Sequence, residues 1–154
     1  MTQSDKLRNY KLNDSEEKFL KYCDKKRLTV MFFHQSPLSY SKRLKSLGGK
    51  RPDFYLKTSL GECLIDVKTS KLDRLPKFTI GLEDLDKLQK TQNILKRTIF
   101  LAYPTDPWGG EDWGFISIED VLKLKESQQN WINNRYPFVG IEYRELKDLR
   151  DLIL

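Results

Sequence analysis

The chain has 154 residues, enough for one domain with a buried core. Its 38% hydrophobic and 32% charged content exclude a disordered chain and are typical of a soluble globular protein. Two cysteines and one histidine are too few for a four-ligand zinc site, and no apolar run has the length of a membrane span. We therefore expect a single-domain cytoplasmic protein, or one acting on DNA inside a cell, with both cysteines reduced and buried.

The net charge of +6 is concentrated in one stretch of the chain. Residues 41–80 carry ten basic and four acidic side chains, a net of +6, whereas residues 101–154 carry a net of −4. Lysine and arginine neutralise phosphates and release counterions, so the pattern predicts a polyanionic partner near residues 41–80. The alternative is a solvated basic surface without such a partner. The candidate phosphate contacts are Lys42, Arg43, Lys45, Lys50, Arg51 and Lys71.

The first third of the chain predicts a helix followed by a strand. Asp14 or Ser15 can cap a helix that runs for about three turns. Residues 28–33 (LTVMFF) are β-branched and aromatic, which is typical of a buried strand. Residues 34–51 are irregular and basic, with one helical turn expected at residues 41–47.

Residues 52–69 predict a β-hairpin with a defined register. Its strands are residues 53–57 and 62–69, and a two- or four-residue connection pairs residues whose numbers sum to 119. This register sets Asp53 directly opposite Asp66, with Cβ atoms about 4.5–5.5 Å apart. Alternation places Asp53, Asp66 and Lys68 on one face of the hairpin. The opposite, apolar face contains Phe54, Leu56, Cys63, Ile65 and Val67.

The rest of the chain predicts an α/β arrangement. Residues 70–81 are expected to be irregular, and a helix at residues 82–95 leads to a strand at residues 98–103 that lies parallel to the second hairpin strand. Residues 104–154 are expected to form a small α/β extension of a core at residues 14–103. The extension has, in order, a strand at residues 114–116, a helix capped by Ser117, a strand at residues 138–141 and a helix patterned by Leu146, Leu149 and Ile153.

Two carboxylates that face each other across a sheet repel, so they require a compensating cation. Mg²⁺, for which Mn²⁺ substitutes, takes oxygen ligands, here Asp53, Asp66 and the backbone carbonyl of Val67, and retains waters that can attack phosphorus. Lys68 would position or deprotonate such a water and stabilise the developing negative charge. In the alternative interpretation, Asp53 only begins a strand, and Asp66 and Lys68 form a surface ion pair.

The spacing of these residues resembles a known motif. Pro52-Asp53, then twelve residues, then Asp66-Val67-Lys68 resembles the signature of the PD-(D/E)XK nuclease superfamily, which includes restriction enzymes, Holliday-junction resolvases and some phage and intron endonucleases. Arg51-Pro52-Asp53-Phe54 is similar to the family's entry to the second strand. Ser15-Glu16-Glu17-Lys18-Phe19 is similar to the first-helix segment whose glutamate joins the metal site. The resemblance covers residues 14–103.

This resemblance implies a restriction-endonuclease-like fold, with the order α-β-β-β-α-β and a mixed sheet flanked by helices. It also implies hydrolysis of phosphodiester bonds with Mg²⁺ or Mn²⁺, usually in DNA. Glu16 would be a further catalytic and metal-binding residue, with Glu17 competing for that role. The catalytic set is then Asp53, Asp66, Lys68 and Glu16, and the metal ligands are Asp53, Asp66, Val67 and Glu16.

The function expected is that of a metal-dependent DNA endonuclease, either site-specific, of restriction or homing type, or junction-resolving. The alternatives are a catalytically silent nucleic-acid-binding module of the same fold and an RNA-directed enzyme or interaction protein. Coordinated cuts in two antiparallel strands predict a homodimer or a higher two-fold-symmetric oligomer acting on double-stranded DNA. The expected protein-binding surface is the acidic segment 104–154, with Trp108, Trp113, Trp131, Phe138 and the stripe of Leu146, Leu149 and Ile153.

Overall fold

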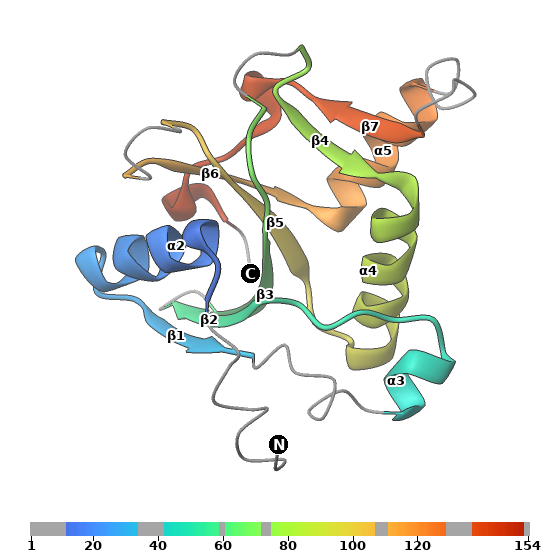
Figure 1. Ribbon diagram of the computed structural model, residues 1–154, viewed down its shortest axis with the longest axis horizontal. Coiled ribbons are helices and arrows are strands. Elements are labelled where there is room, and N and C mark those ends of the chain that lie inside the picture. The colour runs from blue at the N-terminus through green and yellow to red at the C-terminus, as the bar shows by residue number, and fades with distance from the viewer. Residues whose placement is uncertain are drawn as a thin grey trace.

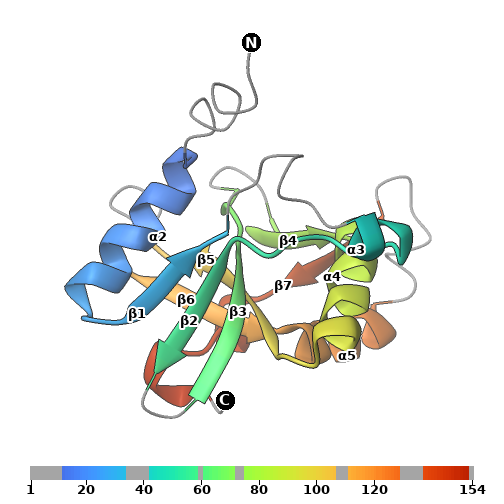
Figure 2. The same ribbon diagram turned by 90° about the horizontal axis from the view of Figure 1, so that it is seen from below.

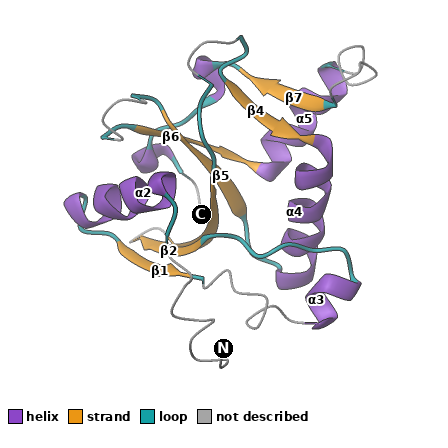
Figure 3. Cartoon of the chain, viewed as in Figure 1, coloured by secondary structure: helices purple, strands orange, loops and turns teal. Residues whose placement is uncertain are grey.

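Among the residues that the structure describes, five strands form one mixed sheet in the order β1-β2-β3-β5-β6, and β4 pairs with β7 in a second sheet. This computed structural model describes residues 12–33, 42–58, 61–71, 75–106, 111–128 and 137–152. The strands are β1 (Thr29–Phe32), β2 (Phe54–Thr58), β3 (Gly61–Val67), β4 (Phe78–Gly81), β5 (Ile99–Pro104), β6 (Trp113–Ser117) and β7 (Phe138–Ile141) (Figure 3). The helices are α2 (Asp14–Lys25), α3 (Lys42–Ser46), α4 (Leu82–Leu95), α5 (Ile118–Ser127) and the 3-10 helices η2 (Tyr143–Glu145) and η3 (Leu149–Asp151).

Helices cover both faces of the five-stranded sheet, with α2 on one side and α4 on the other (Figure 1). On the α2 side, the buried rings of Phe19 and Phe54 lie 5.1 Å apart in a cluster that includes both free cysteines, which are buried as expected. On the opposite side, Leu85 and Leu88 of α4 pack in a second cluster with residues of α5 and the small sheet. Burial on both faces explains why β5 is buried along its whole length.

The predicted hairpin register is confirmed. Residues of β2 and β3 pair from Phe54↔Ile65 to Thr58↔Gly61, so every pair sums to 119. The three strands β1, β2 and β3 lie side by side in Figure 2. The face opposite α2 is less polar than expected, because Leu64 is buried in the α4-side cluster. Polar chemistry is therefore restricted to the ends of these strands.

The parallel unit is also confirmed, since β3 and β5 pair in parallel from Leu64↔Ile99 to Val67↔Ala102. The helix capped by Ser117 forms as expected, because the Ser117 hydroxyl accepts the backbone N–H of Asp120 at 3.1 Å. The first helix differs in its cap: the side chain of Asn13, not Asp14 or Ser15, accepts the N–H of Glu16. The expected helical turn at residues 41–47 is confirmed as α3.

Two sequence predictions about later elements are wrong. Residues 78–81 are not irregular but form β4, whose Phe78 and Ile80 are buried and whose partner strand lies about 60 residues further along the chain. The C-terminal apolar spacing does not form a helix over residues 146–152; η2 and η3 flank an extended segment there. In that segment Lys147 exchanges two backbone hydrogen bonds with Phe115 of β6, which a helical backbone cannot do.

The residues expected to form a C-terminal extension complete both sheets: β6 pairs with β5, and β7 pairs with β4. No helix in the described part of the chain is long and apolar enough to cross a membrane.

Candidate active site

Asp66 lies at the centre of the candidate site, near the end of β3. Its side chain is 1% exposed, and neither carboxylate oxygen accepts a hydrogen bond of good geometry from a described residue. A buried carboxylate without donors is costly, so the charge must be balanced by cations nearby. Two ammonium groups supply part of that balance: Lys68 Nζ lies 2.8 Å and Lys50 Nζ 3.6 Å from Asp66 Oδ2.

Asp53 reaches the same region from the start of β2, but not as the register alone predicts. Its backbone N–H donates to the carbonyl of Ile65, one residue short of Asp66, so the two aspartates do not form the expected directly opposed pair. The Asp53 carboxylate instead accepts the N–H of Val67 at 2.7 Å. Burial, and next the charge of Asp66, raise the pKa of Asp53 to about 8.

Glu16 approaches from the first turn of α2. Glu16 is buried, with 7% of its surface exposed, whereas Glu17 is exposed to solvent. The Asn13 side-chain amide donates to Glu16 Oε1 at 2.5 Å, while Oε2 is buried without a donor among the described residues. Burial and then the charge of Asp66 raise the pKa of Glu16. Asn13 was not singled out from the sequence, although Asn followed three residues later by Glu is a capping-box pattern that indicates it.

Lys68 follows β3 and is held by its backbone and its side chain. Its N–H donates to the carbonyl of Ala102 at 2.8 Å, and its ammonium group contacts both Asp66 and Asp84. Burial by itself lowers the pKa of Lys68, but the two carboxylates more than offset this and raise it above its ordinary value. A charged ammonium donates hydrogen bonds to phosphate and cannot accept a proton, so this geometry favours charge stabilisation over deprotonation of a water.

Asp84 and Lys50 complete the cluster of charges. Asp84, in the first turn of α4, places Oδ1 2.7 Å from Lys50 Nζ and Oδ2 against Lys68 Nζ. Asp84 was not predicted from the sequence, and Lys50 was predicted only as a phosphate contact. Neither position has a motif signal, because Lys50 and Asp84 are separated by 34 residues and come together only in the tertiary structure.

The sequence matches no model of a known protein family, and it matches no curated protein. The structure, however, is similar to that of Hjc from Archaeoglobus fulgidus, a Holliday junction resolvase. The two share 14% sequence identity and a TM-score of 0.51, and the match covers 88% of this chain and 87% of that chain. The chain has the restriction-endonuclease-like fold. The fold expected from the PD-(D/E)XK resemblance is thereby confirmed.

Within this restriction-endonuclease-like fold, Lys50 lies in a backbone segment that is hydrogen-bonded to α4. The buried hydroxyl of Thr91 accepts the N–H of Lys50 and donates to its carbonyl, both at 2.7 Å. This approach requires glycine at position 49, since a Cβ there would lie 2.6 Å from the Leu44 side chain and 2.8 Å from the Thr91 hydroxyl. Gly48, with φ of 77°, adopts the left-handed backbone that turns the chain out of α3.

The other predicted phosphate contacts have different environments. Lys42, Arg43 and Lys45 are exposed on α3, which lies beside α4 in both ribbon views (Figures 1 and 2). Lys71 is also exposed, whereas Arg51 is half-buried. Lys50 enters the cluster around Asp66. His34, Trp108 and Trp131 lie outside the described residues.

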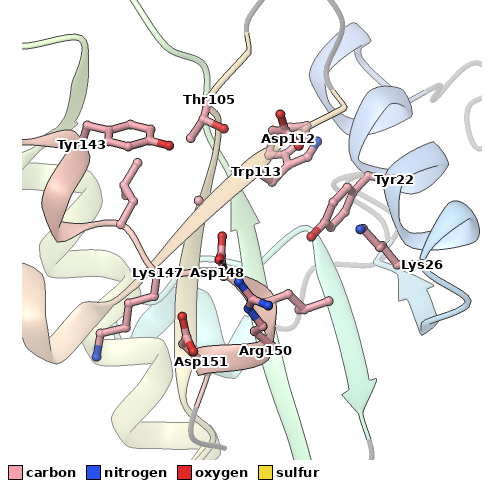
Figure 4. Close-up of a pocket in the computed structure, with 13 residues that line it drawn as sticks. Tyr22, Lys26, Thr105, Asp112, Trp113, Tyr143, Lys147, Asp148, Arg150 and Asp151 are labelled. Carbon is pink, nitrogen blue, oxygen red and sulfur yellow. Dashed lines mark hydrogen bonds and ion pairs between the residues drawn. The ribbon is translucent and has the colours of Figure 1, made fainter.

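A cavity of about 720 Å³ lies elsewhere on the fold, on the α2 side of β6. Tyr22 of α2 and Lys26, which caps the end of that helix, face Trp113 and the segment that carries Lys147 and Arg150 across the cavity (Figure 4). None of the residues of the charged cluster lines this cavity. Basic and acidic side chains alternate around it, so it offers no single sign of charge for a phosphate. The cavity is therefore separate from the candidate site at the end of β3.

The acidic residues at the end of β3 fit a divalent cation by their chemistry. Among the described residues, no three acidic, histidine or cysteine side chains already converge on one point. Asp66 Oδ1 and Glu16 Oε2 are nevertheless buried oxygens without a described donor. Burial and then the charge of Asp66 raise the pKa of both Glu16 and Asp53, which indicates that the three carboxylates lie near one another. Hard oxygen ligands of this kind are those that Mg²⁺ and Mn²⁺ prefer.

Proposed function

We propose that this protein is a metal-dependent DNA endonuclease that hydrolyses phosphodiester bonds at the end of β3. The observation that carries the proposal is the burial of Asp66 and Glu16, both with donor-free oxygens, near the half-buried Asp53. Lys68 Nζ lies 2.8 Å from Asp66. A structural core does not gain stability from two buried carboxylates and a third that is half-buried, whereas a site for a divalent cation requires such a group.

In this proposal each residue has one role. Asp53, Asp66, Glu16 and the backbone carbonyl of Val67 hold Mg²⁺ or Mn²⁺. The bound cation supplies an activated water and neutralises charge on the phosphate. Lys68, fixed by its N–H on β5, donates to a non-bridging phosphate oxygen and stabilises the extra negative charge at phosphorus as the bond breaks.

The test is incubation of the pure, full-length protein with supercoiled plasmid and with a four-way DNA junction, each with Mg²⁺, with Mn²⁺ and with chelator. Metal-dependent cleavage of either DNA supports the proposal. DNA binding that is indifferent to metal, with no cleavage, would identify a catalytically silent module of the same fold instead. A parallel reaction with RNA of the same sequence tests the choice of DNA as substrate.

A junction-resolving nuclease is the second candidate, and the likeness to the A. fulgidus Holliday junction resolvase favours it. A site-specific restriction or homing nuclease rests on the motif resemblance alone. Junction cleavage at two symmetric positions, with the plasmid left intact, would select the junction-resolving function. Fragments of defined length from a long linear DNA of known sequence, without a junction, would select the site-specific function.

Neutralising Lys42, Arg43 and Lys45 of α3 together is expected to flatten the salt dependence of DNA binding. The logarithm of the affinity falls with the logarithm of salt concentration by about 0.9 for each phosphate neutralised, so three lost contacts reduce the slope by up to about 3. The three side chains are exposed, so the fold is not expected to change. Fluorescence anisotropy measures the slope in a series of salt concentrations from roughly 50 to 300 mM, over which screening of exposed charges increases.

The matched control removes three positive charges from the acidic C-terminal third, at Lys123, Lys125 and Lys147. It changes the net charge equally but leaves α3 intact, so its slope should stay near that of the wild type. Equal slopes for the two triple variants would place the DNA-binding surface away from α3.

The active form is expected to have two-fold symmetry, because one site cuts one strand and the two strands of a duplex run antiparallel. The surface first assigned to this contact is wrong in part. Trp113 is 4% exposed and its ring lies 5.2 Å from that of Phe19, and Leu146 and Leu149 pack on the chain's own core. Light scattering at micromolar concentration, with and without junction DNA, measures the oligomeric state; concerted cleavage of both strands by a strict monomer would contradict the prediction.

A further inference from the structure

Asp84 has no role in the chemistry proposed above, yet it makes the shortest contacts to both lysines of the site. Its two oxygens face different ammonium groups, Oδ1 that of Lys50 and Oδ2 that of Lys68. Together with Asp66 these residues form a closed ring of two carboxylates and two ammonium groups, here called the charge ring: Lys50, Asp66, Lys68 and Asp84.

Within the charge ring the lysines lie closer to Asp84 than to Asp66. Lys50 Nζ is 2.7 Å from Asp84 and 3.6 Å from Asp66, a distance beyond that of a hydrogen bond. Lys68 contacts both carboxylates, at 2.8 Å for Asp66 and more closely for Asp84. Asp84 therefore draws positive charge toward α4, and neither oxygen of Asp66 accepts a hydrogen bond of good geometry from a described residue.

Positive charge at Asp66 matters because a divalent cation would have to share that carboxylate with it. An ammonium group within about 4 Å of a metal ligand repels the incoming cation strongly when the site is poorly hydrated. If Asp84 were neutral, both lysines would keep only Asp66 as a close carboxylate partner in the charge ring. Their shift toward Asp66 would then oppose the binding of the cation.

The fold holds Asp84 and Lys50 together on one element. Asp84 lies in the first turn of α4, where the helix dipole stabilises an ionised carboxylate. Thr91, further along the same helix, fastens the backbone of Lys50 through its hydroxyl. The backbone of Lys50 and the side chain of Asp84 are thus both held by α4.

We infer that Asp84 is a positioning residue, which holds the ammonium groups of Lys50 and Lys68 away from Asp66 and so keeps that carboxylate available to a divalent cation. The inference rests on the proposed function, because it assigns Asp66 as a metal ligand. It adds that Lys50 competes with the cation, a role distinct from contact with DNA phosphates.

Calorimetric titration of the metal-free, full-length protein with Mn²⁺ tests this without reference to cleavage. Asp84→Asn should weaken Mn²⁺ binding on the order of tenfold, as coupled neighbouring charges do. Lys50→Met alone should strengthen it several-fold, and adding Lys50→Met to Asp84→Asn should recover most of the loss. Asp86→Asn is the matched control, since Asp86 lies on α4, is exposed and forms an ion pair with Lys90 of the same helix.

Two further readouts separate positioning from a merely structural effect. Asp84→Glu retains the carboxylate and should bind Mn²⁺ more tightly than Asp84→Asn. In cleavage assays, Asp84→Asn should raise the Mn²⁺ concentration needed for half-maximal rate while the rate at saturating Mn²⁺ falls much less. Lys50→Met keeps the inference testable even if Asp84→Asn folds poorly.

Unchanged Mn²⁺ affinity in both Asp84→Asn and Lys50→Met would overturn the inference while leaving the proposed nuclease intact, provided that the wild type binds Mn²⁺ and cuts DNA. A loss in Asp84→Asn that Lys50→Met fails to recover would also overturn it. A wild type that neither binds Mn²⁺ nor cuts DNA would overturn the proposed function itself, and the assignment of Asp84 with it.

Discussion

Lys68→Ala is expected to lower the single-turnover rate of DNA cleavage by at least about 10²-fold, as the loss of one preorganised charge donor does in other active sites. The Lys68 ammonium is the charged donor nearest to Asp66, at 2.8 Å, and it is held on its other side by Asp84. Alanine keeps the backbone N–H that bonds to Ala102, so the end of β3 should stay in place. The variant therefore removes the charged donor while keeping the backbone of the site.

DNA affinity should change little in the same variant. One lysine among several phosphate contacts contributes a small part of the electrostatic binding, so the dissociation constant should stay within a few-fold of wild type. Lys57→Ala, which removes one positive charge from an exposed position on β2, is the control and should cleave at the wild-type rate. Quenched-flow experiments measure the single-turnover cleavage rate, and fluorescence anisotropy on the same DNA measures the dissociation constant. Full nuclease activity in a Lys68→Ala preparation that is free of contaminating nucleases would contradict the assignment of the site.

Asp53→Asn is expected to abolish Mg²⁺ and Mn²⁺ binding and, in the absence of metal, to make the protein more stable than wild type. Burial and the charge of Asp66 raise the pKa of Asp53 to about 8, so the folded state resists ionising a group that the unfolded state ionises near 3.8. Asparagine has no charge to bury, and its side-chain oxygen can still accept the N–H of Val67. Asp66→Asn should likewise abolish metal binding.

The stability difference should depend on pH in a defined direction. Between about pH 4 and pH 8 the folded wild type holds a proton on Asp53 that the unfolded chain has released, so its stability falls through this window as pH rises. Asp53→Asn lacks this loss. Its melting temperature, compared with wild type in chelator, should be similar near pH 4 and higher by on the order of a few degrees at pH 8 and above.

Thermal unfolding across this pH range, with Asp24→Asn as an exposed control from α2, measures the effect. Calorimetry with Mn²⁺ completes the test at pH 7. A melting-temperature difference that shrinks as pH rises would show that Asp53 is not held protonated in the metal-free fold. Retained Mn²⁺ binding in both Asp53→Asn and Asp66→Asn would remove them from the ligand set.

The parts of the fold that were predictable from the sequence depend on neighbours close in the chain. The hairpin register follows from the length of its connection and the two-residue alternation, and pairing from Phe54↔Ile65 to Thr58↔Gly61 agrees with it. The cap at Ser117 is a contact over three residues. The inward position of Glu16 follows from the apolar stripe of α2.

Predictions failed where a distant segment competes for the same backbone. The four residues of β4 are too short for a periodic signal, and they become a strand because β7 supplies their hydrogen bonds. The spacing of Leu146 and Leu149 suits a helix, but Lys147 forms backbone hydrogen bonds with the edge of β6. The segments on either side of Lys147 therefore form only short 3-10 helices. Backbone hydrogen bonds to a partner strand outweigh a weak local helical preference.

By itself, the sequence determined that Asp53, Asp66 and Lys68 belong to one hairpin and lie near its open end, since alternation and turn length leave no other register with both faces satisfied. Only the tertiary structure decided what surrounds them. Asp84 comes from a helix 16 residues beyond Lys68, and Lys50 is brought in by the hydroxyl of Thr91, 41 residues away. Charges attract over short distances in a buried site whatever their separation along the chain, so this part of the site has no local pattern by which to predict it.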